Sequence, residues 1–210
     1  MRTDVFPKQL SFNDNFVSAN GLDKHGFKKW CFYHGMLLNN RNNWWGTPGT
    51  RHSPHEGLDL CLYMDDAGSI RRLGEQIKIP VMYDGQVEAI SDNDFLGKSI
   101  YVSHGIYNEC GKELFTVYAH AEPLQQISPG TRVIGDQIIA EVVDFKLKKA
   151  KMFPHLHISM AWIPETFPPE KLTWKIMGDP TIVTLCDPLE CITRDYTTMT
   201  YRRAVEIPAI

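Results

Sequence analysis

Three groups of histidine and aspartate carry the chemistry that this sequence could perform. They are His55-Glu56-Gly57-Leu58-Asp59, the single His120, and His155-Leu156-His157. Two imidazoles and one carboxylate are the usual donors of a catalytic zinc ion, which keeps its fourth position for water. Zinc lowers the pKa of such a water from about 15.7 to around 7, so that it can attack an amide carbonyl at neutral pH. The residue types therefore predict zinc-assisted hydrolysis.

The set contains more histidines than a three-ligand zinc site requires. A histidine outside the ligand set can take the proton of the attacking water or pass it to the leaving amine. It can also stabilise the tetrahedral oxyanion. His120 and His155 are suited to these roles.

Strand periodicity predicts which of these side chains share a surface. Successive side chains of a strand point to opposite faces, so His155 and His157 fall on one face and the leucine between them on the other. The same alternation places His120 on the face of Tyr118. We therefore expect three half-buried strands, around Asp59, His120 and His157, to share one polar groove.

The spacing between His55 and Asp59 requires a bend in the chain. Four residues of straight strand span about 13 Å at roughly 3.3 Å per residue, too far for both side chains to ligate one ion about 2 Å from each. Gly57 lies midway and permits a bend or a positive φ. Pro54 and Gly57 argue against a helix that would bring the two residues together.

The ordered motifs resemble those of a known family. His55-x-Gly57-x-Asp59, Tyr118-Ala119-His120 and His155-Leu156-His157 are similar, in this order, to the motifs of the lysostaphin-type (LytM-like) zinc endopeptidases, metallopeptidase family twenty-three. Members of that family cut peptide cross-links in bacterial cell walls. The resemblance covers roughly residues 51–161.

The resemblance implies a site, a substrate and a fold. It implies zinc ligation by His55, Asp59 and His157, with His120 and His155 as non-ligand catalytic residues. It implies a peptidoglycan peptide or another peptide as substrate, and a periplasmic or secreted location. The implied fold is mainly β, a mostly antiparallel sheet forming an open groove of the lysostaphin-type, duplicated-hybrid-motif-like kind.

Turn signals agree with a mainly antiparallel fold. Short alternating segments are separated by Asp84-Gly85, Leu96-Gly97, Glu109-Cys110-Gly111 and Pro129-Gly130, which is typical of antiparallel strands. We expect a zinc metallopeptidase domain over residues 50–192. Residues 1–49 are predicted to form an N-terminal extension packed on it, and residues 193–210 a C-terminal tail.

The composition argues against some classes of function. The content of hydrophobic residues, 43%, can fill a core, and the net charge of −3 gives no basic field of the kind that nucleic-acid-binding proteins show. No apolar stretch is long enough for a transmembrane segment, and residues 1–17 lack the apolar region of a signal peptide. The sequence contains one local basic run, Lys146, Lys148, Lys149 and Lys151. It is either a solvated strand end or loop, or a segment that attracts acidic wall polymers or substrate carboxylates.

Other residues are weaker candidates for a functional role. Arg51 and Tyr118 could bind a substrate carboxylate or assist the oxyanion, or could simply pack. His25, His34, His52 and His104 are predicted to be surface or structural residues, with His104 expected beside the groove. Five cysteines without a CxxC pair argue against a cysteine zinc site. Cys61 shares strand parity with Asp59 and is either a buried structural residue or a neighbour of the metal.

Two other classes of protein remain as alternatives. A catalytically silent member of the same fold would bind and activate a cell-wall amidase, but such relatives typically lose metal ligands and this chain keeps all of them. A lipoyl- or biotinyl-type carrier domain would share the glycine turns near residues 85 and 130–135. It would need a lysine at a hairpin tip, and it would leave the histidines unexplained.

Overall fold

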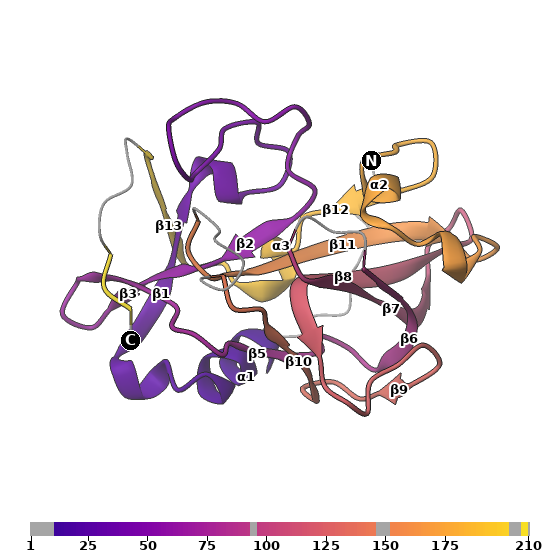
Figure 1. Ribbon diagram of the computed structural model, residues 1–210, viewed down its shortest axis with the longest axis horizontal. Coiled ribbons are helices and arrows are strands. Elements are labelled where there is room, and N and C mark those ends of the chain that lie inside the picture. The colour runs from indigo at the N-terminus through magenta and orange to yellow at the C-terminus, as the bar shows by residue number, and fades with distance from the viewer. Residues whose placement is uncertain (1–10, 93–95, 146–151, 202–206, 210) are drawn as a thin grey trace.

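Most of the regular secondary structure lies in two β-sheets. The computed structural model describes residues 11–92, 96–145, 152–201 and 207–209, so the basic run at 146–151 lies outside the described residues. Figure 1 shows the larger sheet on the right and the smaller one on the left. Both sheets are open and most of their ladders are antiparallel. The expected mainly β class is confirmed.

The larger sheet holds nine strands and carries the candidate site. Its main path runs β12-β11-β8-β7-β6-β9, with β2 paired to β11, β10 paired to β8 and β5 paired to β10. All its described ladders are antiparallel. The strands are β2 (Leu58–Leu60), β5 (Lys78–Pro80), β6 (Gly85–Ser91), β7 (Lys98–Tyr107), β8 (Lys112–Pro123), β9 (Arg132–Val133), β10 (Ile138–Val142), β11 (Leu156–Pro164) and β12 (Thr184–Cys186).

The smaller sheet joins segments from both ends of the described chain. Its order is β13-β1-β3-β4, and β1 pairs with β13 in parallel. Its strands are β1 (Phe27–Tyr33), β3 (Leu62–Asp65), β4 (Ile70–Arg72) and β13 (Tyr196–Met199). The helices are short: α1 (Ser11–Ala19), α2 (Trp174–Met177) and α3 (Leu189–Ile192), with 3-10 turns η1 (Asp23–His25), η2 (His34–Met36) and η3 (Pro169–Lys171).

The strand β11 is buried on both faces, because two hydrophobic clusters enclose it. Ile158 and Met160 belong to the main cluster, which also contains residues of α1, β1 and β3. Ala161 and Ile163 belong to a second cluster with side chains of the 165–183 segment. The expectation of a half-buried strand is therefore wrong for β11. Alternation predicts two faces of a strand, but only the fold supplies the segment that covers the second one.

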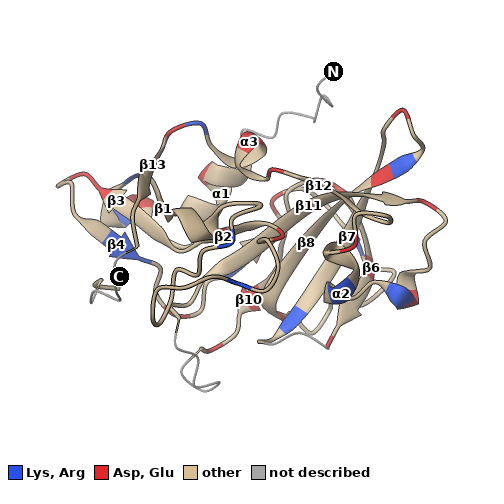
Figure 2. Cartoon of the chain, turned by 90° about the horizontal axis from the view of Figure 1, so that it is seen from above, with Lys and Arg blue, Asp and Glu red and all other residues tan. Residues whose placement is uncertain are grey.

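The placement of the charged residues and the lengths of the helices agree with what the composition indicated. Figure 2 shows basic and acidic residues interspersed along the described chain. Among the described residues, no helix has the length and apolar character needed to cross a membrane.

The packing of β11 yields a first prediction. Leu156 is fully buried between β2 and β8, so Leu156→Ala leaves a cavity and should lower the free energy of unfolding by about 2–5 kcal/mol. Ile134→Ala is the control, because Ile134 is 68% exposed. Urea unfolding of the metal-free proteins measures both changes. Equal transition midpoints for Leu156→Ala and the parent would contradict the strand phase described here.

Candidate metal centre

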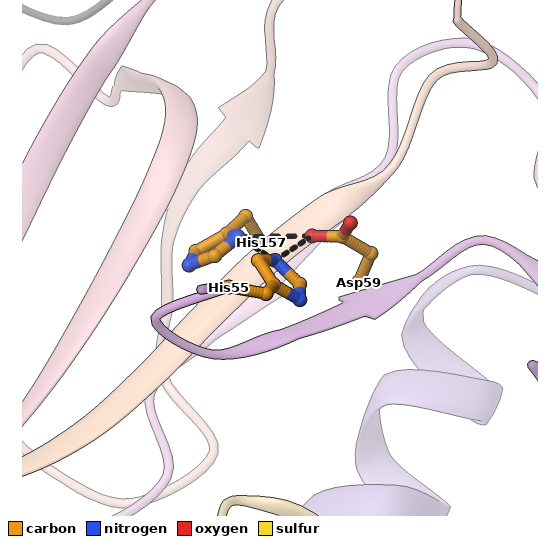
Figure 3. A group of neighbouring side chains, drawn as sticks. All are labelled: His55, Asp59 and His157. Carbon is orange, nitrogen blue, oxygen red and sulfur yellow. Dashed lines mark hydrogen bonds and ion pairs between the residues drawn. The ribbon is translucent and has the colours of Figure 1, made fainter. Parts of the chain in front are cut away.

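Three buried side chains converge on one point. His55 Nε2, Asp59 Oδ1 and His157 Nδ1 lie 3.1, 3.0 and 2.9 Å apart in the pairs His55–Asp59, His55–His157 and His157–Asp59. Each residue is 2 or 3% exposed. Figure 3 shows the three side chains turned toward one another, with Asp59 on β2 and His157 on β11. The group could hold a metal ion.

Strand register brings two of these residues together. β2 pairs antiparallel with β11, and Asp59 is directly opposite His157. Directly opposite residues of an antiparallel pair have Cβ atoms about 4.5–5.5 Å apart on the same face of the sheet. The carboxylate and the imidazole therefore meet without any distortion of either strand.

His55 reaches the other two because the chain bends before β2 at Gly57. Gly57 does not have a positive φ. A Cβ at this position would lie 2.3 Å from the Ile158 carbonyl oxygen, 2.7 Å from Ser159 Oγ and 2.8 Å from His157 Nε2. The predicted bend is confirmed, and the need for glycine comes from its close approach to β11.

The outer nitrogens of His55 and His157 have partners. His55 Nδ1–H donates to the Leu37 carbonyl oxygen at 3.2 Å. His157 Nε2 lies 3.0 Å from Ser159 Oγ, which accepts its proton when Nδ1 faces Asp59. Such outer partners fix the tautomer and the ring orientation of metal-binding histidines. In the tautomers with protonated outer nitrogens, both inner nitrogens present lone pairs toward Asp59.

This donor set fits a tetrahedral metal ion. Two imidazole nitrogens and a carboxylate oxygen 2.9 to 3.1 Å apart repel one another unless a proton or a cation lies among them. A tetrahedral zinc ion with bonds of about 2.0–2.1 Å holds its ligand atoms about 3.3 Å apart, close to these separations. The three donor atoms thus suit zinc in their number, in their chemical type and in the distances between them.

Two further histidines adjoin the group. The ring centroids of His120 and His155 are 4.8 Å apart, and those of His120 and His157 are 6.1 Å apart. His155 Nε2 is 3.7 Å from Asp59 Oδ1. His120 Nδ1–H donates to the Leu96 carbonyl oxygen at 2.9 Å, and His155 Nδ1–H to that of Phe153 at 2.8 Å. Each therefore keeps an unprotonated Nε2 for proton transfer.

His120 reaches the site through an irregularity in β8. Its φ is 58°, in the left-handed region, and the register of β7 against β8 shifts between Lys98 and Ile100. Tyr118 belongs to the main core cluster and faces away from His157. The expectation that Tyr118 and His120 share a face is therefore wrong. A bulge turns the side chain that follows it away from regular alternation.

Burial lowers the pKa of three of the clustered histidines. It lowers the pKa of His120 to about 3, and the neighbouring His155 and His157 act in the same direction. Burial also lowers the pKa of His155 and of His157. For Asp59, burial favours a higher pKa, but the charges and hydrogen bonds of the histidines outweigh it and hold that pKa well below the usual range. A carboxylate and neutral imidazoles are the protonation states that metal binding requires.

The segment before the first motif contributes contacts that the sequence analysis missed. Trp44 Nε1 donates to Asp59 Oδ2 at 2.6 Å, and its ring centroid lies 5.0 Å from that of His155. Trp174 of α2 packs against His157 with a centroid distance of 4.7 Å. No local pattern in the sequence marks either tryptophan, because each reaches the site only through the tertiary fold.

The weaker candidates Arg51 and Tyr118 are held by contacts within the fold. Arg51 Nη2 donates to the Gly35 carbonyl oxygen at 2.6 Å and lies 3.7 Å from Asp59 Oδ2, so it faces the Asp59 carboxylate. Tyr118 is fully buried, and its hydroxyl accepts from Met82 N and Thr116 Oγ1. The suggested substrate role of Tyr118 is therefore wrong.

The remaining histidines and Cys61 are also accounted for. His104 is buried, with its two nitrogens bonded to the Asp84 carbonyl and to Thr116 Oγ1, and burial lowers its pKa to about 4. His25, His34 and His52 are exposed, which confirms the prediction of surface or structural roles. Cys61 Sγ points to the Pro154 carbonyl and is outside the metal group.

A cavity of about 370 Å³ opens beside His120 and His155. Phe145 lines it, and the Phe145 ring lies 5.6 Å from His120 and 5.2 Å from His155. The other lining residues are Glu75, Gln76, Ile77, Glu122, Glu141, Val142, Val143, Asp144 and Pro154. This volume is within the range of small-ligand pockets.

Comparison with known proteins finds similar solved structures only. No family model matches the chain, and no curated protein matches it significantly. The solution structure of lysostaphin is 17% identical with a TM-score of 0.40, over 68% of this chain and 49% of lysostaphin. Helicobacter pylori Csd3 is 22% identical with a TM-score of 0.40, over 77% of this chain and 34% of Csd3. The catalytic domain of the prophage-encoded M23 protein EnpA from Enterococcus faecalis is 17% identical with a TM-score of 0.38, over 70% of this chain and 96% of that domain.

The chain thus spans about half of lysostaphin and a third of Csd3. At these identities and TM-scores, the function proposed below rests on the residues of the site.

The close approach at Gly57 yields a second prediction. Gly57→Ala places a methyl group against β11 and should lower the free energy of unfolding by about 1–3 kcal/mol through overpacking. Gly178→Ala is the matched control, because a Cβ there meets only the Lys175 carbonyl oxygen at 3.9 Å. Urea unfolding of the metal-free proteins compares the two. A Gly57 variant as stable as the parent would show that β2 and β11 are further apart at this point.

Proposed function

We propose that this chain is a zinc-dependent endopeptidase that hydrolyses peptide cross-links of bacterial peptidoglycan. The observation that carries the proposal is the pairing of two kinds of histidine in one buried cluster. His55 and His157 turn lone pairs toward Asp59, whereas His120 and His155 hold a free Nε2 beside that group. A structural zinc site would need four closed ligands and no spare bases.

The substrate and the location follow from the motif resemblance. The three ordered motifs are similar to those of enzymes that act on cell-wall peptides, and the proposed substrate is accordingly a peptidoglycan peptide. A periplasmic or secreted location is part of the same proposal. The cavity beside Phe145 is the place where a residue of the substrate next to the scissile bond would fit.

The proposed ligands are His55, Asp59 and His157. When bound, zinc supplies a water of lowered pKa and polarises the carbonyl of the scissile bond. The protein then has three tasks: to accept the proton of the attacking water, to deliver a proton to the leaving amine, and to neutralise the developing oxyanion.

His120 and His155 are placed for these tasks. Backbone carbonyls hold the Nδ1 protons of both rings, so each Nε2 can accept a proton without a change of tautomer. Once protonated, an imidazolium can donate to the leaving nitrogen or to the oxyanion. Burial lowers the pKa of both histidines, which favours the prompt return of that proton to the substrate.

Digestion of purified peptidoglycan tests the proposed function. The zinc-loaded protein should release peptide fragments with new amino and carboxyl termini, identified by mass spectrometry, and elemental analysis should find close to one zinc per chain. Asp59→Ala is the matched control and should lose both zinc and fragments, because three protein ligands are needed for a stable catalytic site. Intact peptidoglycan after treatment with the zinc-bound parent would exclude the endopeptidase and favour the silent, amidase-activating alternative.

Replacement of His120 separates a catalyst from a ligand. Asparagine tolerates the left-handed backbone of this position, so His120→Asn removes the imidazole and preserves the bulge. The variant should keep its zinc and lose about 10²- to 10⁴-fold in the rate of hydrolysis. The exposed His52 offers the control His52→Asn, with an unchanged rate. Loss of zinc from His120→Asn would make His120 a ligand, and an unchanged rate would make it a bystander.

A further inference from the structure

The two oxygens of Asp59 have different partners. Oδ1 faces the imidazoles, at 3.1 Å from His55 Nε2 and 2.9 Å from His157 Nδ1. Oδ2 faces Trp44 Nε1, at 2.6 Å, and Arg51 Nη2, at 3.7 Å. One oxygen of the carboxylate, Oδ1, thus faces the proposed metal position. The other, Oδ2, accepts a hydrogen bond from the segment before the first motif.

The tryptophan is the stronger of the two partners of Oδ2. Its distance of 2.6 Å is short for a hydrogen bond to a charged acceptor, and such bonds are roughly twice as strong as neutral ones. The short bond of the Arg51 guanidinium goes instead to the Gly35 carbonyl oxygen, at 2.6 Å. Arg51 therefore contributes charge near Asp59, whereas Trp44 directs one oxygen.

The surrounding segment holds Trp44 in place. Trp44 is 2% exposed and packs edge-on against both Trp45 and His155. The segment folds back on itself, with backbone bonds from Asn43 N to Gly49 O and from His55 N to Asn40 O. The same turn therefore orients the indole and delivers the first ligand histidine.

We propose that Trp44 is a positioning residue for the metal ligand Asp59. The indole N–H occupies Oδ2, so that Asp59 offers only Oδ1 to the ion. A carboxylate that binds through one oxygen leaves a four-coordinate ion with a position free for water, which a carboxylate binding through both oxygens would crowd. This inference rests on the proposed metal site and goes beyond it, because Trp44 belongs to none of the three motifs.

The test compares Trp44→Phe with Trp45→Phe. Phenylalanine keeps an aromatic ring against His155 and removes the N–H donor. Trp45 is the matched control, because it packs against Arg51 and Trp44 rather than against Asp59. Zinc affinity, measured by competition with a chelator, should fall about 10- to 100-fold in Trp44→Phe, the usual effect of losing an outer partner of a ligand. It should be unchanged in Trp45→Phe.

A spectroscopic measurement separates positioning from loss of packing. The cobalt(II)-loaded parent should show the intense visible absorption of a four-coordinate ion, and Trp44→Phe the weaker bands of higher coordination as Asp59 binds through both oxygens. A variant with parental zinc affinity and a parental cobalt spectrum would overturn the inference. A parent that binds neither metal would overturn the proposed function as well.

The indole proton itself gives a second test that needs no variant at Trp44. In the parent, the Trp44 Nε1 proton should resonate far downfield and exchange slowly with water, both before and after zinc is added. The indole of the partly exposed Trp174 provides the internal comparison. A Trp44 proton that exchanges as fast as that of Trp174 would overturn the inference even if the substituted protein failed to fold.

Discussion

Two imidazole nitrogens and one carboxylate oxygen are held 2.9 to 3.1 Å from one another in a buried cluster, and this electrostatic constraint explains the arrangement around them. Such a cluster destabilises a fold unless a proton or a cation lies among the three atoms. The chain nevertheless builds this cluster from two segments nearly a hundred residues apart. The cross-strand register of β2 on β11 and the absence of a side chain at Gly57 both serve to bring the three atoms together.

The direction of each imidazole is decided by the backbone. Three of the four clustered histidines donate Nδ1–H to a carbonyl oxygen, of Leu37, Leu96 or Phe153, and so present Nε2 to the site. His157 presents Nδ1 instead, because its Nε2 faces Ser159 two residues along the same strand. His55, a proposed ligand, and His120 and His155, the proposed bases, are thus oriented by the same kind of bond. The proposed ligands differ from His155 in their distance to Asp59 Oδ1, which is 3.1 Å for His55, 2.9 Å for His157 and 3.7 Å for His155.

Local irregularities concentrate at this site. His120 adopts a left-handed backbone that costs of order 1–3 kcal/mol for most residues, and the chain bends at Gly57. Packing elsewhere offsets such costs: β11 is enclosed by hydrophobic clusters on both faces. The segment with Trp44 and Arg51 adds two positive or donor groups to the outer oxygen of Asp59. Rigid surroundings of this kind hold reactive groups in place before a substrate arrives.

The sequence by itself determined which imidazole and carboxylate groups are available as metal donors, and it determined the mainly β class. It also determined the shared face of His155 and His157 and the bend between His55 and Asp59. These features depend on residue identity and on the alternation within one strand, which are local properties. Tertiary structure alone decided that Tyr118 packs in the core while His120 turns to the site, because a bulge depends on the register of two strands. It also decided that Trp44 bonds to Asp59 and that the 165–183 segment covers the second face of β11. Contacts between distant parts of the chain arise from the packing of the whole fold, and no local pattern of residues encodes them.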